Sequence, residues 1–541
     1  MKVECCPVSD LPHTSTLFRE YMTGAPGLVE RLYSPHRTGT AWMQFASACG
    51  PDHWMDRATR AAVVGLLTKQ NLAMGAGTET LANLGRLADG ANAVVTGQQV
   101  GLFGGPLMTL AKAATAVRRA EDASRAGHPH VPIFWMASED HDLAEVDHVL
   151  LPGKDSGLHP LRLKTPTHHA VPVGNIPLGG AVRPLLDELQ KYLGDGDAWR
   201  LLADAYTPEN TYAGAFGRLL HHLFARHGLI VIDASTRDFH ALARPVLRAA
   251  IEQAAPLREA LQERTRTLES SGHHAQVLVT DTSSLLFLLD EKTGARHALK
   301  QTTKEMWAAG NERYHTKDLL AILDSAPERI SPSALLRPVM QDALLPTSAY
   351  IGGPAEIAYF AQSQVVYERV LGRVTPVLPR LSITLVEHAT ARLLEHYGLA
   401  ITDIFHGADE LAQRLAARSL PVEGKRRLAA TGDALEQEIN GLLAWMEAQD
   451  VSLGHAARTA ASKMRYQMGR LRRLAANFAL QRENKLRRHA EMLQQHLFPS
   501  GHLQDRVLAG AWFLRLAPEG LVPLLVEHAH GRCPGNLIVP L

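Results

Sequence analysis

Residues 91–107 read ANAVVTGQQVGLFGGPL, and residues 131–142 read VPIFWMASEDHD. Each stretch opens with a short apolar run, which is typical of a buried strand. Between them, Pro106 suits the first position of a helix, and a helical pattern follows from 107 to about 125. Strand, loop, helix and strand in this order form a βαβ unit. The sequence therefore predicts an α/β fold with a parallel sheet.

The α/β pattern continues outward from this unit, with interruptions. Residues 1–90 have apolar residues at helical spacing, a further buried strand is expected at 228–233, and the pattern returns at 338–353. Residues 151–200 are rich in proline, glycine and histidine, which indicates an excursion dominated by loops. A small β-rich insertion is predicted from strands at 276–280 and 285–290, with 296–299 as a third.

The last third of the chain has a helical character of its own. From Leu435 to Phe478 apolar residues recur every three or four positions, which predicts an antiparallel coiled-coil hairpin that turns near 450–454. Between Lys463 and Arg488 there are nine Lys and Arg against one acidic residue, Glu483. This basic stretch is either a solvated helix face or a surface for an anion or acidic partner.

Five segments follow from these patterns: helices and the first half of the core (1–150), the continued core with its insertions (151–330), a second part of the core (331–390), the helical coiled-coil domain (391–496), and a return to the core (497–541).

Composition excludes several classes of protein. The 541 residues are 46% hydrophobic and 21% charged, which fits a globular chain of two or three domains. A net charge of +1 argues against a nucleic-acid or membrane-surface partner. Four cysteines without a CxxC pair exclude a disulfide-rich scaffold and favour the reducing cytoplasm. No signal peptide or membrane span is recognisable, so we expect a soluble cytoplasmic protein.

The loop at 96–107 follows a parallel strand, and ligands bind outside the carboxyl ends of such strands. Its glycines allow a ligand to approach the backbone, and its two glutamine amides can donate and accept hydrogen bonds. It has neither a Walker A ending nor the GxGxxG spacing. A ligand loop is favoured over a merely tight turn.

Ionisable residues follow the second strand. His141 could act as a general base or phosphate contact, with Asp140 and Asp142 orienting it, and Glu139 could hold an ammonium group. The alternative is an acidic helix N-terminus, which we favour for Asp142 and the acidic residues after it.

Two later segments add candidates. Arg337 could bind a carboxylate and Glu356 an amine, or either could belong to a structural ion pair. Gly352 and Gly353 indicate a strand-to-helix switch. The segment 497–506 has the composition of a hinge, and the residues around Arg380 are expected near it.

These motifs resemble those of the bacillithiol biosynthesis cysteine-adding enzyme family (BshC). The matching blocks are TGQQVGLFGGPL (96–107), FWMASEDHD (134–142), residues 337–356, PVLPRLSITLVE (376–387) and residues 497–506. They follow the expected order over nearly the whole chain, and the first block is highly specific.

The resemblance implies a Rossmann-like nucleotidyltransferase-type core with connective insertions and a C-terminal coiled-coil domain that forms a homodimer. It implies a cysteine ligase that joins the cysteine carboxyl group to the amine of glucosaminyl malate. A free carboxylate is a poor acyl donor, so we expect ATP to activate it, and Mg²⁺ could accompany the nucleotide. No HIGH or KMSKS signature is present, which leaves activation through AMP or through ADP open.

Three sets of site residues are predicted, without a protein-bound metal. The catalytic set is Gln98, Glu139, Asp140 and His141. The substrate- and nucleotide-binding set is Thr96, Gly97, Gln99, Gly104, Gly105, Asp142, Arg337, Gly352, Gly353 and Glu356. A second nucleotide pocket is expected near Arg380, Ser382, Ser500, Gly501 and Gln504.

Two alternatives stay open at this point. The first is a metal-dependent hydrolase or deacylase with Asp140, His141, Asp142 and His148 as ligands, although no HxH or HExxH spacing supports it. The second is a non-catalytic partner of the bacillithiol pathway that binds other proteins through its coiled coil.

Overall fold

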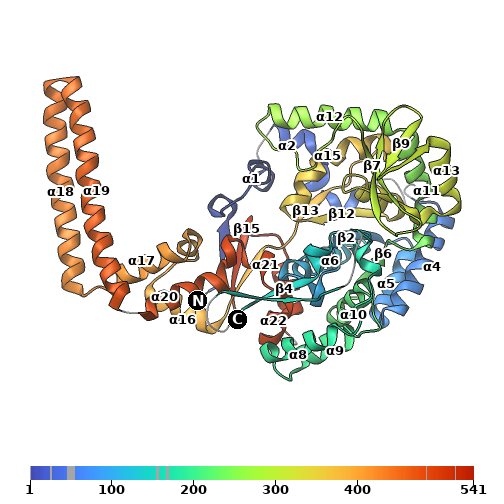
Figure 1. The fold of residues 1–541 in the computed structure, drawn as a ribbon, viewed down its shortest axis with the longest axis horizontal. Helices are drawn as coiled ribbons and strands as arrows, with labels where there is room; N and C mark the ends of the chain where they lie inside the picture. The colour runs from blue at the N-terminus through green and yellow to red at the C-terminus, as the bar shows by residue number, and fades with distance from the viewer. Residues whose placement is uncertain are drawn as a thin grey trace.

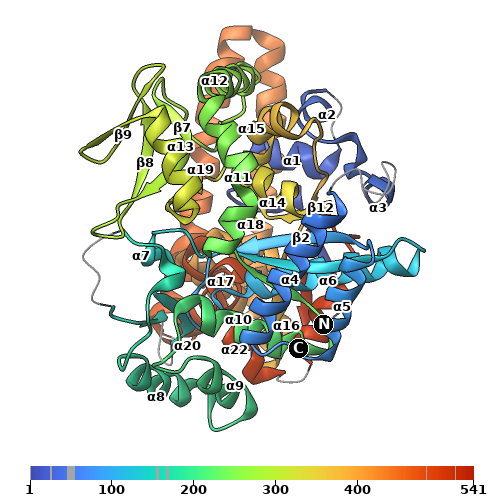
Figure 2. The same ribbon diagram turned by 90° about the vertical axis from the view of Figure 1, so that its right-hand side faces the viewer.

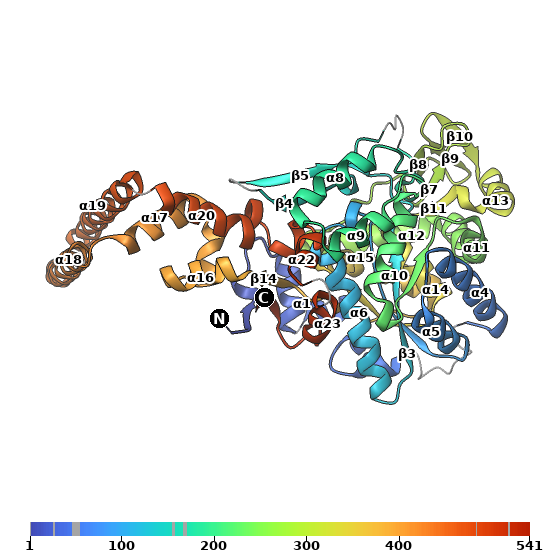
Figure 3. The ribbon, with the colours of Figure 1, turned by 90° about the horizontal axis from the view of Figure 1, so that it is seen from below.

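The computed structural model describes residues 2–24, 27–45, 55–153, 157–165, 170–482, 484–517 and 520–541. A large α/β body carries a long helical arm, which projects away from the body in Figure 1 and again, from below, in Figure 3. The two chain ends lie side by side, because the first strand pairs with the last. No helix among these residues is both long and apolar enough to cross a membrane.

A five-stranded sheet lies at the centre of the body, and all of its strands are parallel. In spatial order they are β13 (Val377–Pro379), β12 (Thr347–Gly352), β2 (Asn92–Gln98), β3 (His130–Met136) and β6 (Ile230–Asp233). Helix α6 (Leu107–Arg125) connects β2 to β3, so the predicted βαβ unit is confirmed. The chain runs from β2 through β3 to β6, and later adds β12 and β13 on the other side of β2. The switch point of the sheet is therefore between β2 and β12.

Helices cover both faces of this sheet, which explains why its strands are almost uniformly apolar. Val95 of β2 packs in the core on one face, and its neighbour Val94 packs against α6 on the other. The first face is covered by α4 (Arg57–Ala73), α5 (Thr78–Ala88), α11 (Arg237–Glu252), α14 (Arg337–Leu344) and α15 (Pro354–Leu371). Helix α10 (Tyr212–Leu223) joins α6 on the second face, and Figure 2 shows the layers from the side.

The β-rich insertion is a five-stranded antiparallel sheet. Its order is β10 (Glu312–His315), β9 (Met306–Ala309), β8 (Arg296–Gln301), β7 (Ser283–Leu289) and β11 (Ile330–Pro332). The strands predicted around 285–290 and 296–299 are confirmed, but the one at 276–280 is wrong. There the backbone of Val277 pairs with the side-chain amide of Gln362, which accepts from its N–H and donates to its carbonyl, both at 2.8 Å. A side chain takes the place of a neighbouring strand.

The loop-dominated excursion expected at 151–200 is partly wrong. It contains a hairpin of β4 (His148–Pro152) and β5 (Leu158–Arg162), followed by helices α8 (Val182–Leu193) and α9 (Asp197–Ala205). Helix α8 buries Val182, Leu185 and Leu189, whose helical spacing outweighs the proline and glycine content around it. Residues 154–156 and 166–169 lie outside the described part of the chain.

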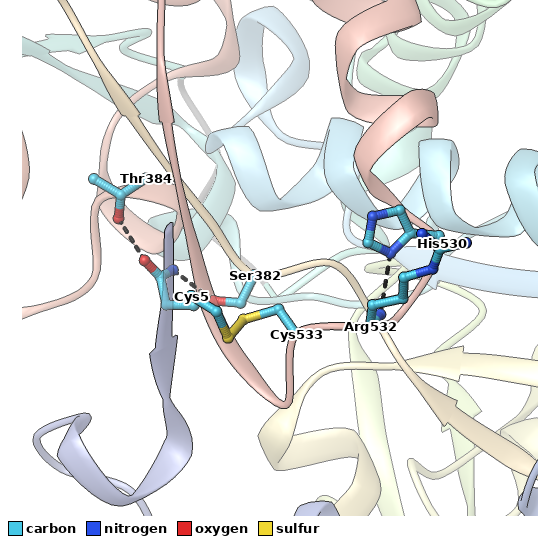
Figure 4. The surroundings of a disulfide bond; sticks show 7 residues. Cys5, Ser382, Thr384, His530, Arg532 and Cys533 are labelled. Carbon is cyan, nitrogen blue, oxygen red and sulfur yellow. Dashed lines mark hydrogen bonds between the residues drawn. A yellow bond between two sulfur atoms is a disulfide. The ribbon is translucent and has the colours of Figure 1, made fainter. Parts of the chain in front are cut away.

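The two ends of the chain meet in a small third sheet, β1 (Glu4–Pro7), β15 (Gly535–Pro540) and β14 (Ile383–Val386). A disulfide joins Cys5 to Cys533 beside this sheet (Figure 4), while Cys6 is a buried free thiol. Cys49 lies outside the described residues. The cysteine count argued for a protein of the reducing cytoplasm and did not anticipate this bond.

The arm confirms the predicted helical hairpin. Helices α18 (Val422–Gln449) and α19 (Val451–Arg482) pack against each other and are separated by Asp450, within the predicted turn. The arm joins the body through α16 (His388–Tyr397), α17 (Ala408–Ser419) and α20 (Asn484–Leu497). In the basic stretch, the described side chains such as Arg472 and Lys485 are exposed, which fits a solvated face; Glu483 lies outside the described residues.

The remaining helices are α1 (Thr16–Thr23), α2 (Leu28–Leu32), α3 (Ala41–Phe45), α7 (Leu143–Val146), α12 (Ala254–Ser270), α13 (Thr316–Ser325), α21 (Gln504–Val507), α22 (Gly510–Leu516) and α23 (Leu521–His528).

Candidate active site

A cavity of about 370 Å³ opens at the switch point of the parallel sheet. It lies where β2, β3 and β12 end, which is the position that ligands take in open α/β sheets. Its polar lining includes Gly97, Gln98, Gln99, Lys112, Asp140, Glu145, Arg337, Tyr350, Gly353, Glu356, Tyr359, Arg380 and Arg506. Four basic and three acidic side chains thus face one small volume.

A buried ion pair between Lys112 and Glu356 forms the floor of the site. Lys112 lies on α6 and Glu356 in the first turn of α15, so the pair joins helices on opposite faces of the sheet. The ammonium group also donates to the Gly97 carbonyl at 2.7 Å and to Gln98 Oε1 at 2.8 Å. Its three N–H groups therefore have three acceptors, and Lys112 holds the loop after β2 rather than a ligand.

The carboxylate of Glu356 is equally saturated. It accepts from the Gly353 backbone N–H at 2.8 Å and from the Tyr350 hydroxyl at 2.6 Å. Burial by itself would raise the pKa of Glu356, but Lys112 and the Gly353 N–H outweigh it, and the pKa is lowered. Of the two sequence-based alternatives for Glu356, an amine site or a structural ion pair, the second is present, with Lys112 as the partner.

Arg337 occupies the wall beside this pair. Its guanidinium donates to the hydroxyls of Tyr359 at 2.9 Å and Tyr350 at 3.2 Å, and to the Gln341 side chain. It also lies near the faces of Trp135 and Tyr350, 6.0 and 5.5 Å from the ring centroids. No carboxylate is among the described hydrogen-bond partners of Arg337, so its positive charge remains available to an anion.

The two glutamines of the TGQQ motif both line the cavity. Gln98 is held by Lys112, and Gln99 Nε2 donates at 2.6 Å to a carboxylate oxygen of Asp140 and to one of Glu145. The loops after β2 and β3 are thereby joined, as the parallel register of the strands allows. Asp140 also accepts from the backbone N–H of His141.

Three residues of the predicted loop have structural roles instead. The Thr96 hydroxyl is buried and donates to the Ile351 carbonyl of β12. The N–H of Gly104 donates to the Tyr206 hydroxyl at 2.9 Å, and that of Gly105 donates to the Leu102 carbonyl. Gly104 and Gly105 belong to the predicted substrate- and nucleotide-binding set, but these backbone donors are already used in the interior.

The other predicted glycines do lie at a cavity. A Cβ on Gly97 would be 2.8 Å from the Trp135 carbonyl oxygen, so only glycine fits between β2 and β3 there. Gly353 lines the main cavity, and Gly352 lines a neighbouring one. The strand-to-helix switch predicted at this pair is confirmed, with Pro354 as the first residue of α15.

Most of the acidic motif after β3 points away from the cavity. Glu139 bonds the buried His240 of α11, with 2.6 Å between Oε1 and Nε2, so it is not free for a substrate ammonium. His141 Nδ1 accepts at 3.3 Å from Arg296, which reaches over from the β-rich insertion. Neither Glu139 nor His141 lines the cavity. Asp142 is exposed at the N-terminus of α7, which agrees with the predicted acidic helix N-terminus.

A second cavity of about 370 Å³ adjoins the first near the predicted second pocket. Arg380, Ser382 and Gly501 line it, and Arg380 and Arg506 are common to both cavities. Ser500 is exposed outside it, and Gln504 is buried with its amide on the backbone of Leu385. The expected proximity of Arg380 to the 497–506 segment is confirmed by its ion pair with Asp505.

Sequence reasoning missed Lys112, Glu145, Tyr350, Tyr359 and Arg506. A signal existed for Lys112: it is the single charged residue between 101 and 117, inside an apolar helix that follows the ligand loop. A lysine at such a position requires a buried partner. The tyrosines carry no comparable signal, because aromatic residues are ordinary components of a core.

The described residues contain no group of three or more His, Cys, Asp or Glu side chains placed to hold a metal ion. His148 bonds the carboxylate of Asp147, which also accepts from Arg162, in a hairpin rather than in a ligand shell. The metal-dependent hydrolase therefore has no supporting geometry among them.

Comparison with known proteins identifies the family. Residues 1–381 match the model of the bacillithiol biosynthesis BshC N-terminal Rossmann-like domain, and residues 383–531 match that of the BshC C-terminal coiled-coil domain. Relatives named "Putative cysteine ligase BshC" include proteins of Koribacter versatilis (42% identical, 99% of both chains) and Solibacter usitatus (38% identical, 98% of this chain and 95% of the relative). A Salinibacter ruber relative of the same name is 32% identical over 84% of each chain. With a Rossmann-like core, a coiled-coil arm and full-length relatives of this kind, the chain belongs to the bacillithiol biosynthesis BshC family.

Proposed function

We propose that this protein is a cysteine ligase that joins the carboxyl group of cysteine to the amine of glucosaminyl malate at the expense of ATP. The observation that carries the proposal is the switch-point cavity, whose opposite charges suit reactants of both signs. The names of the relatives contribute cysteine as the substrate that is ligated, and the family models contribute the bacillithiol pathway.

The chemistry requires activation of the cysteine carboxylate before the amine attacks. If ATP transfers its adenylyl group, pyrophosphate leaves first and AMP leaves when the amide forms. If ATP transfers its γ-phosphoryl group, ADP leaves first and inorganic phosphate follows. Both routes place several negative oxygens beside the reacting carbonyl carbon, where positioned cations stabilise them.

The basic wall of the cavity is suited to those oxygens. Arg337 keeps its charge among aromatic rings, and Arg506 makes no side-chain hydrogen bond or ion pair to the described residues. Arg380 is neutralised by Asp505, which leaves Arg337 and Arg506 as the phosphate-binding candidates. Asp140 and Glu145 line the same cavity and attract the ammonium group of an incoming substrate.

The second cavity is proposed as a further nucleotide or anion pocket. It shares Arg380 and Arg506 with the first cavity, so a charged ligand in either one acts on the same guanidinium groups. Nucleotide titration of an Arg506→Ala variant tests this, and unchanged affinity would contradict it.

The arm is proposed to form a homodimer. Leu442, Trp445, Leu471 and Leu474 on α18 and α19 are all more than half exposed, which is unusual for a helical hairpin that stays alone in water. Trp445→Glu combined with Leu474→Glu should convert a dimer to a monomer in analytical ultracentrifugation. Leu278→Glu, at a leucine of the body that is still more exposed, is the control.

The ligase proposal is tested by incubating the purified protein with glucosaminyl malate, cysteine, ATP and Mg²⁺ and following the thiol product, AMP and ADP by mass spectrometry. Product with AMP establishes adenylation, and product with ADP establishes an acyl phosphate. Arg506→Ala should reduce turnover, whereas Arg266→Ala, which removes an exposed arginine on α12, should not. Absence of product would contradict the proposal.

A further inference from the structure

The two glutamines at the mouth of the cavity are fixed in opposite orientations. A side-chain amide can face its surroundings with either its oxygen or its nitrogen, and only its partners decide which. Gln98 meets the ammonium group of Lys112, which can only donate, so Oε1 must face Lys112. Gln99 meets the carboxylates of Asp140 and Glu145, which only accept when ionised, so Nε2 must face them.

Each amide therefore has one end left for a ligand. Gln98 Nε2 has no hydrogen-bond acceptor among the described residues, and Gln99 Oε1 has no donor there. Both residues line the cavity. Neighbouring residues at the end of β2 thus present one donor and one acceptor, and neither amide can flip without breaking a charge-assisted hydrogen bond.

We propose that Gln98 and Gln99 form the subsite for an α-amino acid, with the carboxylate accepting from Gln98 Nε2 and the ammonium group donating to Gln99 Oε1. Asp140 and Glu145 are bonded to Gln99, the amide that receives the ammonium group, whereas Gln98 is bonded to Lys112, whose charge is balanced by Glu356. Lys112 is then a positioning residue: it touches no ligand and acts by orienting Gln98. The inference rests on the proposed function for the identity of the amino acid, cysteine.

Two substitutions test the two amides separately. Each keeps the hydrogen bond to the protein and removes the group that the amide offers to the ligand. Gln98→Glu keeps an acceptor for Lys112 but replaces the donor offered to the ligand by a carboxylate oxygen. Gln99→Lys keeps a donor for Asp140 and Glu145 but removes the acceptor. Gln262→Glu is the matched control, since Gln262 of α12 donates to the exposed Asp281 and does not line the cavity.

The test is calorimetric titration of each variant with L-cysteine, with 3-mercaptopropionate, which lacks the ammonium group, and with cysteamine, which lacks the carboxylate. Gln98→Glu should weaken L-cysteine and 3-mercaptopropionate by about tenfold or more and leave cysteamine unchanged. Gln99→Lys should weaken L-cysteine and cysteamine by a similar factor without weakening 3-mercaptopropionate. The control should bind all three like the unchanged protein.

Equal affinity of Gln98→Glu and the unchanged protein for 3-mercaptopropionate would overturn the subsite, as would absence of L-cysteine binding to the unchanged protein. Because binding is measured without ATP or turnover, the two proposals fail separately. Cysteine binding with the expected selectivity but without amide product would contradict the ligase proposal and support the subsite. Product formation by the Gln98→Glu variant with an unchanged KM for cysteine would support the ligase and contradict the subsite.

Discussion

The guanidinium of Arg380 and the carboxylate of Asp505 form an ion pair of 2.5 Å in which both side chains are almost completely buried. Arg380 follows β13 of the parallel sheet, and Asp505 lies in α21, where the chain returns from the arm. Asp505 also accepts from the backbone N–H of Ile383 at 3.2 Å. The pair therefore joins the segment that returns from the coiled-coil arm to the core. It also fixes Arg380 in the wall shared by the two cavities.

Asp505→Ala should destabilise the protein by about 3–5 kcal/mol, because it leaves the Arg380 charge buried without a partner. Chemical denaturation followed by circular dichroism measures the loss. Glu423→Ala removes an exposed ion pair with Arg427 on the arm and should have little effect. Equal effects of the two substitutions would contradict a special role for burial.

The pair of Lys112 and Glu356 should behave as one unit. Glu356→Gln leaves the buried ammonium group of Lys112 without a negative partner and should cost several kcal/mol, on the order of 3–5. Lys112→Met combined with Glu356→Gln should recover part of that loss, which a double-mutant cycle reports as a coupling energy. Additive effects would show that the two residues act independently.

The core of the fold could be predicted because its signals are local. The apolar runs of β2 and β3 and the proline before α6 each specify one element, and together they leave few topologies open. The strand predicted at 276–280 failed because its partner is the side chain of Gln362, 85 residues away. Helix α8 was not predicted although its apolar spacing is present in the sequence, because the proline and glycine residues around it are typical of loops.

The predicted loops after β2, β3 and β12 contribute residues to one cavity, but the hydrogen bonds within these loops could not be predicted. Position after a strand identifies Gln98 and Gln99, since the ends of parallel strands gather at one edge of the sheet. It cannot distinguish a donor left free from one already used, as in Gly104, whose N–H is bonded to Tyr206. Nor can it reveal that Glu139 has a partner 101 residues away in His240. Long-range pairing decides which polar residues remain for a ligand.

His221 should make the protein sensitive to mild acid. Both of its ring nitrogens lack a partner among the described residues, and burial lowers its pKa to about 4. The unfolded chain takes up a proton near pH 6.5 and the folded chain does not, so the stabilisation is complete above pH 6.5 and is lost as the pH falls toward 4. This one group contributes about 3 kcal/mol to the pH dependence.

His221→Leu should therefore flatten the fall in unfolding free energy between pH 7 and pH 4.5, as measured by urea denaturation at several pH values. His222→Leu changes the next residue, which is exposed, and should keep the slope of the unchanged protein. An identical slope in both variants would mean that His221 does not titrate with unfolding.

The disulfide between Cys5 and Cys533 should stabilise the fold by holding the two ends of the chain together. The bond closes a loop with a sequence separation of 528 residues and lies beside the pairing of β1 with β15. Cross-links of this kind typically contribute about 2–4 kcal/mol by restricting the unfolded chain. Cys533→Ser should thus lower the melting temperature, and a reductant should lower it in the unchanged protein but not in the variant.

Peptide mapping under non-reducing conditions decides which thiol takes part. Cys6 is the neighbour of Cys5, but burial, together with Asp10, raises the pKa of the Cys6 thiol to about 11. Its thiolate, the form that attacks a disulfide, is then scarce at neutral pH, so Cys6 should not exchange with Cys5. The map should contain a peptide pair that links Cys5 to Cys533, with Cys6 unpaired. A peptide pair that links Cys6 to Cys533 would contradict this assignment, because the buried Cys6 would then form the disulfide instead of Cys5.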